Sequence, residues 1–296
     1  MIAVIIGLGG CSQKDEIAES NDQLQVVSTS TIIANLTEEI AGENINHVSI
    51  LPPGNDPHIY EPVPQDSIEL EKADLILYNG YNLEPNIIKL INSSGIKAEK
   101  LAVGEQVKPL DFDYEGQKRP DPHVWGDAKN GIIMVESIRD KLIELNPENE
   151  AIFQANSAQL ITELKELDSW IKNQISTIPV EQRKLITSHD AFQYYSQAYG
   201  LEIPGTLIGI STEEQPSAQT VKNLVEIIKN TGVKAIFAET TINPTLINTV
   251  AEEAGVTLAE GELYSDSLGV KGSEADTYIK MLTVNTNSIV SALTQN

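Results

Sequence analysis

The hydrophobic pattern in the first half of this chain alternates between short β-branched runs and stretches with helical spacing. The expected strands are 24–28, 48–51 and 75–78, and the expected helices are 31–40, 67–72 and 84–91. Strands that alternate with helices along a chain usually form a parallel sheet. The first half therefore predicts an α/β lobe.

A much longer helix is predicted from Asn146 and Pro147 onward. Asn146 is suited to cap this helix, and Pro147 is suited to its first turn. Apolar residues then recur at intervals of three, four or seven until about Ile175, so that one stripe of the helix is apolar. About 28 residues at about 1.5 Å each span roughly 40 Å, which is longer than one small lobe requires. We therefore expect this helix to join two lobes.

The same alternation restarts after the long helix. The expected strands are 184–187, 205–210 and 235–238, and the expected helices are 191–199, 221–229, 245–254 and 274–293. The predicted fold class is α/β, with two lobes, each a mainly parallel sheet flanked by helices, joined by one long rigid helix. The expected boundaries are 24–146 for the N-terminal lobe, 147–177 for the linking helix and 178–296 for the C-terminal lobe.

The composition limits the kinds of molecule that the protein is expected to bind. The chain has 296 residues, of which 41% are hydrophobic, as is ordinary for a globular protein. Its 20 basic and 43 acidic residues give a formal net charge of -23, which repels nucleic acid and attracts cations. Cys11 is the single cysteine, so an intramolecular disulfide and a cysteine-based metal site are both excluded.

The N-terminal segment looks like a targeting signal. An apolar run too short to span a bilayer precedes Cys11, with small residues directly before the cysteine and Leu8 three positions upstream. Residues 1–11 therefore resemble a bacterial lipoprotein signal peptide with Cys11 as the lipidated residue, although no Lys or Arg precedes the run. The alternative is an apolar terminus with an incidental cysteine. Residues 12–23 are expected to form a polar tether, which would place the protein outside the cytoplasm, attached to a bacterial membrane by its lipid anchor only.

Three of the four histidines lie where loops are expected. An Asp-Pro-His tripeptide occurs twice, ending at His58 and at His123, and the proline restricts the Asp before it and so stiffens the unit. His189 lies between an expected strand and an expected helix, whereas His47 lies inside a strand pattern and is interpreted as structural. Ligands of open α/β sheets bind beyond the carboxyl ends of strands. The three loop histidines are therefore candidate ligands.

Neutral imidazoles favour zinc and other first-row divalent metals. A closed site with three of them needs a fourth donor, and Asp266 and Glu239 are the candidates, between which spacing does not decide. A zinc enzyme, with water as the fourth ligand, is an alternative, but the sequence contains no catalytic motif such as HExxH or GxSxG. An adhesion protein whose metal is purely structural is another alternative.

At these residues the chain resembles the substrate-binding lipoproteins of zinc and manganese ABC importers, the TroA-like family. The similarity extends from about Leu24 to Leu293 and rests on GNDPHIYEP, DPHVW, TSHDAFQYYSQAYGL and GELYSDSLG, in that order. The metal ligands that this resemblance implies are His58, His123, His189 and Asp266. Glu239 then becomes a nearby group that supports the ligands.

The resemblance also implies a function. A monomer would capture zinc or manganese between its lobes and deliver the ion to an ABC permease and its ATPase, without acting as an enzyme. Zinc-dedicated members often carry a His-rich insertion before the second ligand, and residues 107–120 contain no His. Many manganese-dedicated members place Glu where this chain has His189. The cargo is therefore left open between zinc and manganese, and cell adhesion is an additional role of related lipoproteins.

Overall fold

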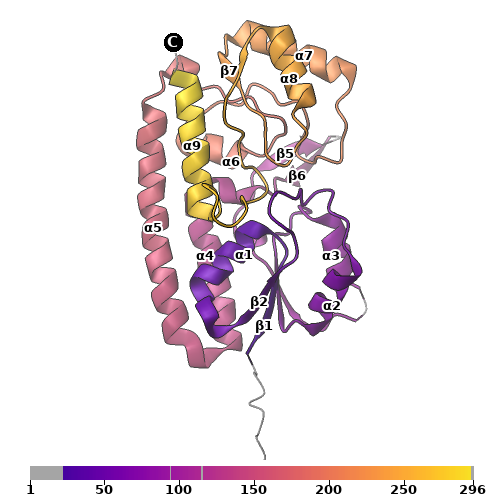
Figure 1. Ribbon diagram of the computed structural model, residues 1–296, viewed down its shortest axis with the longest axis vertical. Helices are drawn as coiled ribbons and strands as arrows, with labels where there is room; N and C mark the ends of the chain where they lie inside the picture. The colour runs from indigo at the N-terminus through magenta and orange to yellow at the C-terminus, as the bar shows by residue number, and fades with distance from the viewer. Residues whose placement is uncertain (1–22, 94, 115, 295–296) are drawn as a thin grey trace, which may run out of the picture.

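The computed structural model describes residues 23–93, 95–114 and 116–294. The expected signal peptide, Cys11 and the expected tether up to residue 22 lie outside the described residues. Figure 1 shows two stacked halves, with β1, β2, α2 and α3 in the lower half and β7, α7 and α8 in the upper half. One long helix, α5 (Glu150–Ser176), runs beside both halves.

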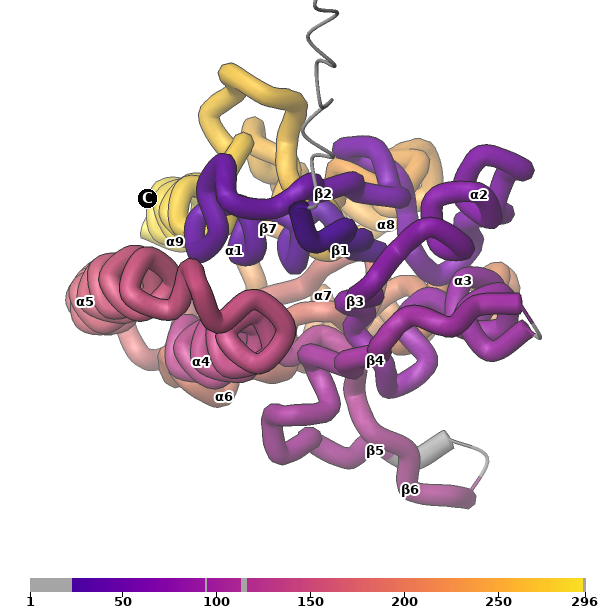
Figure 2. Tube along the Cα trace, turned by 90° about the horizontal axis from the view of Figure 1, so that it is seen from below, coloured from indigo at the N-terminus to yellow at the C-terminus, as the bar shows by residue number. Residues whose placement is uncertain are grey.

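A four-stranded parallel sheet forms the centre of the N-terminal half, in the order β2-β1-β3-β4. Its strands are β1 (Gln25–Ser28), β2 (Asn46–Ser49), β3 (Leu75–Tyr78) and β4 (Glu99–Ala102). Figure 2 shows α1 on one side of this sheet and α2 and α3 on the other. Because helices cover both faces, the central strands β1 and β3 are mostly buried, as their apolar sequences require.

Three helices and one 3₁₀ turn connect the strands of this sheet, and a further 3₁₀ turn follows β4. They are α1 (Thr31–Ala41), η1 (Gly42–Asn44), α2 (Pro64–Lys72), α3 (Pro85–Ile91) and η2 (Gly104–Gln106). Strand β2 begins two residues before the expected run at 48–51. The apolar residues Ile50 and Leu51 leave this edge strand and pack instead into a cluster with α2 and α3.

A β-hairpin and a long helix follow the last strand of this sheet along the chain. Strands β5 (Asp111–Tyr114) and β6 (Gln117–Pro120) pair antiparallel and lead through η3 (Val124–Gly126) into α4 (Ala128–Leu145). The side chain of Asp127 accepts a hydrogen bond from the backbone nitrogen of Lys129 at 2.9 Å, which caps α4. Helix α4 packs along α5 and was not predicted from the sequence.

Helix α5 follows η4 (Pro147–Asn149) and contains 27 residues. It packs against α1 and α4, and also against α6 (Gln193–Tyr199) and α9 (Tyr278–Thr294) of the C-terminal half. One hydrophobic cluster includes buried residues from all five of these helices. The two halves are therefore joined by a shared core and not only by a crossing chain.

The C-terminal half has a smaller sheet. Strand β7 (Ala235–Ile236) pairs in parallel with β8 (Thr257–Leu258), and single bridges join Lys184 to Glu202 and Glu239 to Leu263. The helical elements around it are η5 (Val180–Gln182), α7 (Ala218–Thr231) and α8 (Thr245–Ala254).

The strands expected at 184–187 and 205–210 do not form full ladders. The second stretch follows Pro204 and contains Gly205 and Gly209, and both residue types weaken a strand. It still approaches the sheet, because the backbone nitrogen of Ile208 donates to the carbonyl of Ser188 at 2.8 Å. No helix within the described ranges is long and apolar enough to cross a membrane.

Candidate metal centre

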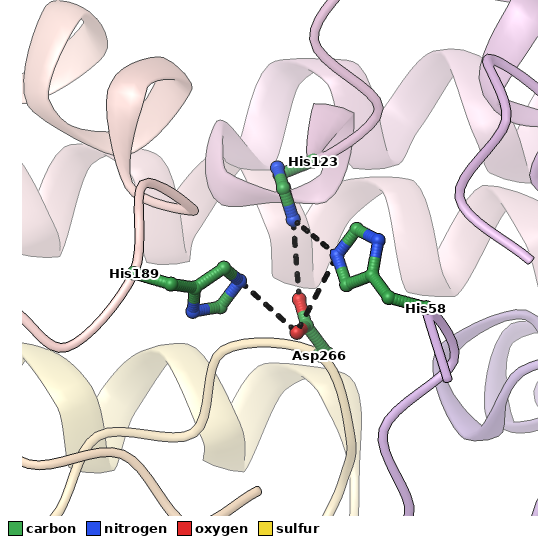
Figure 3. A group of neighbouring side chains, drawn as sticks. All are labelled: His58, His123, His189 and Asp266. Atoms are coloured by element: carbon green, nitrogen blue, oxygen red, sulfur yellow. Dashed lines mark hydrogen bonds and ion pairs between the residues drawn. The ribbon is translucent and has the colours of Figure 1, made fainter. Parts of the chain in front are cut away.

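Four buried side chains from four separate loops meet where the two halves of the molecule face each other (Figure 3). His58 lies between β2 and α2, His123 directly precedes η3, His189 lies before α6, and Asp266 lies between β8 and α9. None of the four is more than 2% exposed. One nitrogen or oxygen from each residue lies within 4.8 Å of the others. The structure thus brings together the four residues that the sequence resemblance implied.

The atoms that converge are electron-pair donors. The Nε2 atoms of His58 and His123 are 3.2 Å apart. Nε2 of His189 lies 3.2 Å from Oδ2 of Asp266, and Nε2 of His123 lies 3.4 Å from Oδ1. Nε2 of His189 and both carboxylate oxygens of Asp266 form no hydrogen bond with any described residue. Buried polar atoms without hydrogen bonds are costly, and one cation between them would satisfy the whole group.

Each Asp-Pro-His tripeptide forms a local turn. Oδ1 of Asp56 accepts a hydrogen bond from the backbone nitrogen of His58 at 2.9 Å, and Oδ1 of Asp121 does the same for His123 at 2.9 Å. Asp side chains commonly make this bond to the backbone two residues on. Only the stiffness that proline imposes on each tripeptide was predicted from the sequence. The Asp two positions before each His was the signal for this turn.

Two carboxylates bind the ring nitrogens that point away from the centre. Oδ1 of Asp121 lies 2.7 Å from Nδ1 of His123, and Oε2 of Glu239 lies 2.5 Å from Nδ1 of His189. The other oxygen of Glu239 accepts from the backbone nitrogen of His189 at 2.7 Å. A carboxylate on Nδ1 fixes the ring and leaves Nε2 free to bind a metal. Glu239 thus contacts His189 from behind and is not one of the four converging residues.

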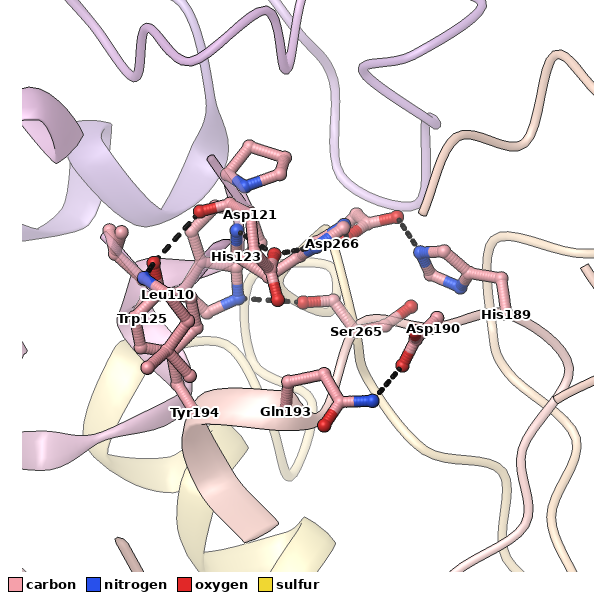
Figure 4. A network of polar contacts seen from close by, with 12 residues as sticks. Leu110, Asp121, His123, Trp125, His189, Asp190, Gln193, Tyr194, Ser265 and Asp266 are labelled. Carbon is pink, nitrogen blue, oxygen red and sulfur yellow. Dashed lines mark hydrogen bonds and ion pairs between the residues drawn. The ribbon is translucent and has the colours of Figure 1, made fainter. Parts of the chain in front are cut away.

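Further hydrogen bonds attach the loop after β6 to the C-terminal half (Figure 4). The hydroxyl of Tyr194 donates to the carbonyl of Asp121 at 2.9 Å and accepts from the backbone nitrogen of Leu110 at 2.9 Å. Nε1 of Trp125 donates to the carbonyl of Ser265 at 2.8 Å. These bonds fix the loop that carries the second histidine relative to α6 and to the loop that carries the aspartate.

A buried polar network supports the same loop from the N-terminal half. Nδ2 of Asn79 donates to the carbonyl of Pro122 at 3.0 Å. Oε1 of Glu84 accepts from the backbone nitrogen of Asn79 at 2.7 Å and from the hydroxyl of Thr29 at 2.8 Å. Burial raises the pKa of Glu84 to about 7. These three residues were not predicted from the sequence, because nothing in their spacing relates the end of β3 to the loop at Pro122.

The electrostatics of the centre favour a bound cation. Burial lowers the pKa of His58 to about 3, so this imidazole is neutral. Burial also disfavours charge on His189 and Asp266. For His189, the nearby carboxylates of Glu239 and Asp266 outweigh burial and raise its pKa well above the usual value. For Asp266, the surrounding imidazoles outweigh burial and lower its pKa, so the carboxylate is ionised.

His47 lies apart from this centre, in β2. Its Nδ1 is 3.2 Å from Oε1 of Glu38, and its Nε2 is 2.9 Å from the hydroxyl oxygen of Ser28. Both ring nitrogens therefore have partners elsewhere, in agreement with the structural interpretation of this histidine.

Comparison with known proteins shows which family the chain resembles. The family model described as "Zinc-uptake complex component A periplasmic" matches residues 26–292. The chain is 35% identical to the manganese-binding lipoprotein MntA of Halalkalibacterium halodurans, covering 100% of this chain and 97% of that protein. It is 36% identical to the manganese ABC transporter substrate-binding lipoprotein ScaA of Streptococcus gordonii, covering 99% and 96% of the two chains.

Solved structures show the same fold. The periplasmic zinc-binding protein TroA of Treponema pallidum superimposes with a TM-score of 0.87 at 32% identity, covering 92% of this chain and 99% of that one. A manganese-bound periplasmic metal-binding protein of Candidatus Liberibacter asiaticus superimposes with a TM-score of 0.81 at 27% identity, covering 90% and 98%. The predicted class of two α/β lobes is therefore confirmed.

Proposed function

Because the chain belongs to the family of zinc-uptake complex component A proteins, we propose that it captures a divalent transition metal, zinc or manganese, and delivers it to an ABC-type import permease. The family resemblance identified from the sequence is thereby confirmed. The observation that carries the proposal is the convergence of three imidazoles and one carboxylate, all buried, with donor atoms facing one another.

The proposed ligands are Nε2 of each of the three histidines and the carboxylate of Asp266. In each case the geometry leaves the donor atom pointing to the common centre. Glu239 is proposed to hold His189 in the tautomer that can bind metal. Both oxygens of Asp266 face imidazole nitrogens, so the carboxylate can bind through one oxygen or two. One oxygen completes the tetrahedral set that zinc prefers, and two give the higher coordination that suits manganese.

The protein is proposed to act as a carrier and not as an enzyme. The family consists of solute-binding proteins of transporters. With four protein ligands, a tetrahedral ion has no open position for the water that a catalytic zinc normally holds. An ion held this way is protected and can be passed on intact.

The relatives named lipoproteins support a location outside the cytoplasm, with Cys11 as the proposed point of lipid attachment to a bacterial membrane. The partners are a permease and its ATPase, and the proposed solution state is a monomer. Helix α5 is proposed to act as a rigid link between lobes at 24–146 and 178–296, since its buried stripe belongs to a core shared by both halves. Metal release is then expected to involve small shifts of the ligand loops and not a wide hinge opening.

Titration of the metal-free protein with zinc and with manganese tests binding, with magnesium as the control ion. Saturation at about one zinc or manganese per chain, without competition from magnesium, is expected. Delivery is tested in proteoliposomes that contain the permease and ATPase of the same importer, where metal-loaded protein should stimulate ion accumulation. Folded protein that binds neither ion, or loaded protein that never supports accumulation, would contradict the proposal.

A further inference from the structure

The two Asp-Pro-His tripeptides use their aspartates differently. Oδ1 of Asp121 contacts both the backbone nitrogen and Nδ1 of His123, while its Oδ2 forms no hydrogen bond with any described residue. Asp56 keeps the local bond to the backbone nitrogen of His58 through Oδ1. Its second oxygen, Oδ2, accepts a hydrogen bond from the hydroxyl of Thr212 at 2.6 Å. Asp121 therefore orients an imidazole, whereas Asp56 connects its loop to a distant residue.

That distant residue belongs to the other half of the molecule. Thr212 lies in the segment between α6 and α7, 156 positions after Asp56 in the sequence. Thr212 is 7% exposed and Asp56 is 8% exposed, so water has little access to the bond between them. A short, buried hydrogen bond to a carboxylate is stronger than an ordinary one between neutral groups. The loop of the first histidine is therefore fastened to the opposite half beside the metal centre.

A second bond holds the same loop to the C-terminal half. The backbone nitrogen of Gly54 donates to the hydroxyl oxygen of Ser267 at 2.8 Å, and Ser267 directly follows the proposed ligand Asp266. This bond joins the beginning of the first-histidine loop to the aspartate loop. The bond between Asp56 and Thr212 joins the same loop to a different segment, so the two bonds restrain it from two directions.

We propose that Thr212 is a positioning residue that acts through Asp56, keeping the loop of His58 closed against the C-terminal half and so slowing metal dissociation. This inference rests on the proposed function. The bond is made only when the loop is closed, so it stabilises the loaded, closed state more than any open state that precedes loading. Its loss leaves the local turn of Asp56 intact, because that turn uses the other oxygen. The effect should therefore fall on the rate of dissociation and not on the rate of association.

The substitution Thr212→Val tests this role, because valine has the shape of threonine without the hydroxyl. Thr212→Ser restores the hydroxyl and is the rescue variant. Thr206→Val is the matched control, since the hydroxyl of Thr206 donates only to the carbonyl of Ile208 within its own segment, at 2.9 Å. Zinc-loaded protein is mixed with excess chromophoric chelator in a stopped-flow instrument, and association is measured by mixing metal-free protein with zinc. Thermal unfolding of each metal-free variant checks its fold.

Zinc dissociation from the Thr212→Val protein is expected to be about tenfold faster than from the wild type, the order of magnitude that one hydrogen bond to a charged group contributes. Association should be unchanged, and both Thr212→Ser and Thr206→Val should dissociate like the wild type. Equal dissociation from Thr212→Val and wild type would overturn the inference, as would an equal acceleration in Thr206→Val or a failure of serine to rescue. A wild-type protein that binds no zinc and no manganese would instead overturn the proposed function.

Discussion

Nδ1 of His189 lies 2.5 Å from Oε2 of Glu239, and both side chains are fully buried. The carboxylate can only accept, so the imidazole must place its proton on Nδ1. In the neutral ring Nε2 then carries a free electron pair, and it points toward Asp266 at the centre. A residue that is not among the four proposed ligands thus decides whether one of them can bind a metal.

Glu239→Gln should weaken metal binding while leaving the fold intact. An amide NH₂ facing Nδ1 would reverse the ring's proton arrangement, so that Nε2 carries the proton and cannot bind the ion. A loss of about 10- to 100-fold in zinc affinity is expected. Competition titration with a chelator measures it, and Glu260→Gln, at an exposed position of the same half, is the control. Equal affinities of wild type and Glu239→Gln would show that this carboxylate does not set the tautomer.

Metal affinity should fall as the pH is lowered. Despite burial, the carboxylates of Glu239 and Asp266 raise the pKa of His189 well above 6.5, so the metal-free site holds a proton there at neutral pH. The metal must displace this proton, so the zinc affinity should change by up to about tenfold per pH unit below the raised pKa. The pKa of His58 is about 3, so this imidazole contributes nothing to the pH dependence of the affinity near neutrality. Zinc competition titrations from pH 6 to 8 measure how the zinc affinity changes with pH. An affinity that does not change over this range would contradict the prediction.

Glu84 should make the protein less stable as the pH rises. Burial raises its pKa from 4.5 to about 7, so the folded state holds a proton that the unfolded state has already released. The stabilisation that comes from this retained proton is fully present below about pH 4.5. It is lost as the pH rises through about 7, which lowers the free energy of unfolding by about 3 kcal/mol. Glu84→Gln removes this titration. Urea unfolding measures the free energy of unfolding of the metal-free wild type and the metal-free variant at pH 5 and pH 8. Relative to the wild type, the variant should be more stable at pH 8 than at pH 5. A difference that does not change with pH would refute the raised pKa of Glu84.

Removal of the metal should not unfold the protein. The three hydrophobic clusters comprise apolar residues outside the proposed ligand set: one lies in each half, and the third is shared by both halves. Circular dichroism of chelator-treated protein should retain its helical signal. Zinc at 100 times its dissociation constant should raise the free energy of unfolding by about 2.7 kcal/mol. A chelated protein without cooperative unfolding would favour a purely structural metal, as the adhesion hypothesis requires.

The long elements were the most predictable part of the fold. The apolar stripe from Phe153 to Ile175 places α5 correctly, because apolar spacing of three, four or seven sustained over so many residues fits a helix and not a strand. Helix α8 and strand β3 also have the expected bounds. The stretch 205–210 looked like a strand by composition, but its glycines and the preceding proline prevent a ladder. Which of these two tendencies prevails depends on packing that the sequence does not reveal.

The candidate ligands were accessible from the sequence because each lies in a recognisable motif. Residue chemistry alone left Asp266 and Glu239 as equal candidates for the fourth donor. Their roles separate only in three dimensions, where Glu239 contacts the outer nitrogen of His189. Thr212 was not predictable at all, because no local pattern relates it to Asp56, 156 residues away.

The most direct test of the central claim is the metal content of the purified protein, measured by elemental mass spectrometry without added metal. The variant His58→Ala/His123→Ala removes two proposed ligands, and His47→Ala is the control because this histidine lies in β2. Wild type and control should each retain about one zinc or manganese ion per chain, and the folded double variant should retain none. A folded double variant that keeps its metal, or a folded wild type that neither contains nor takes up either ion, would contradict the account.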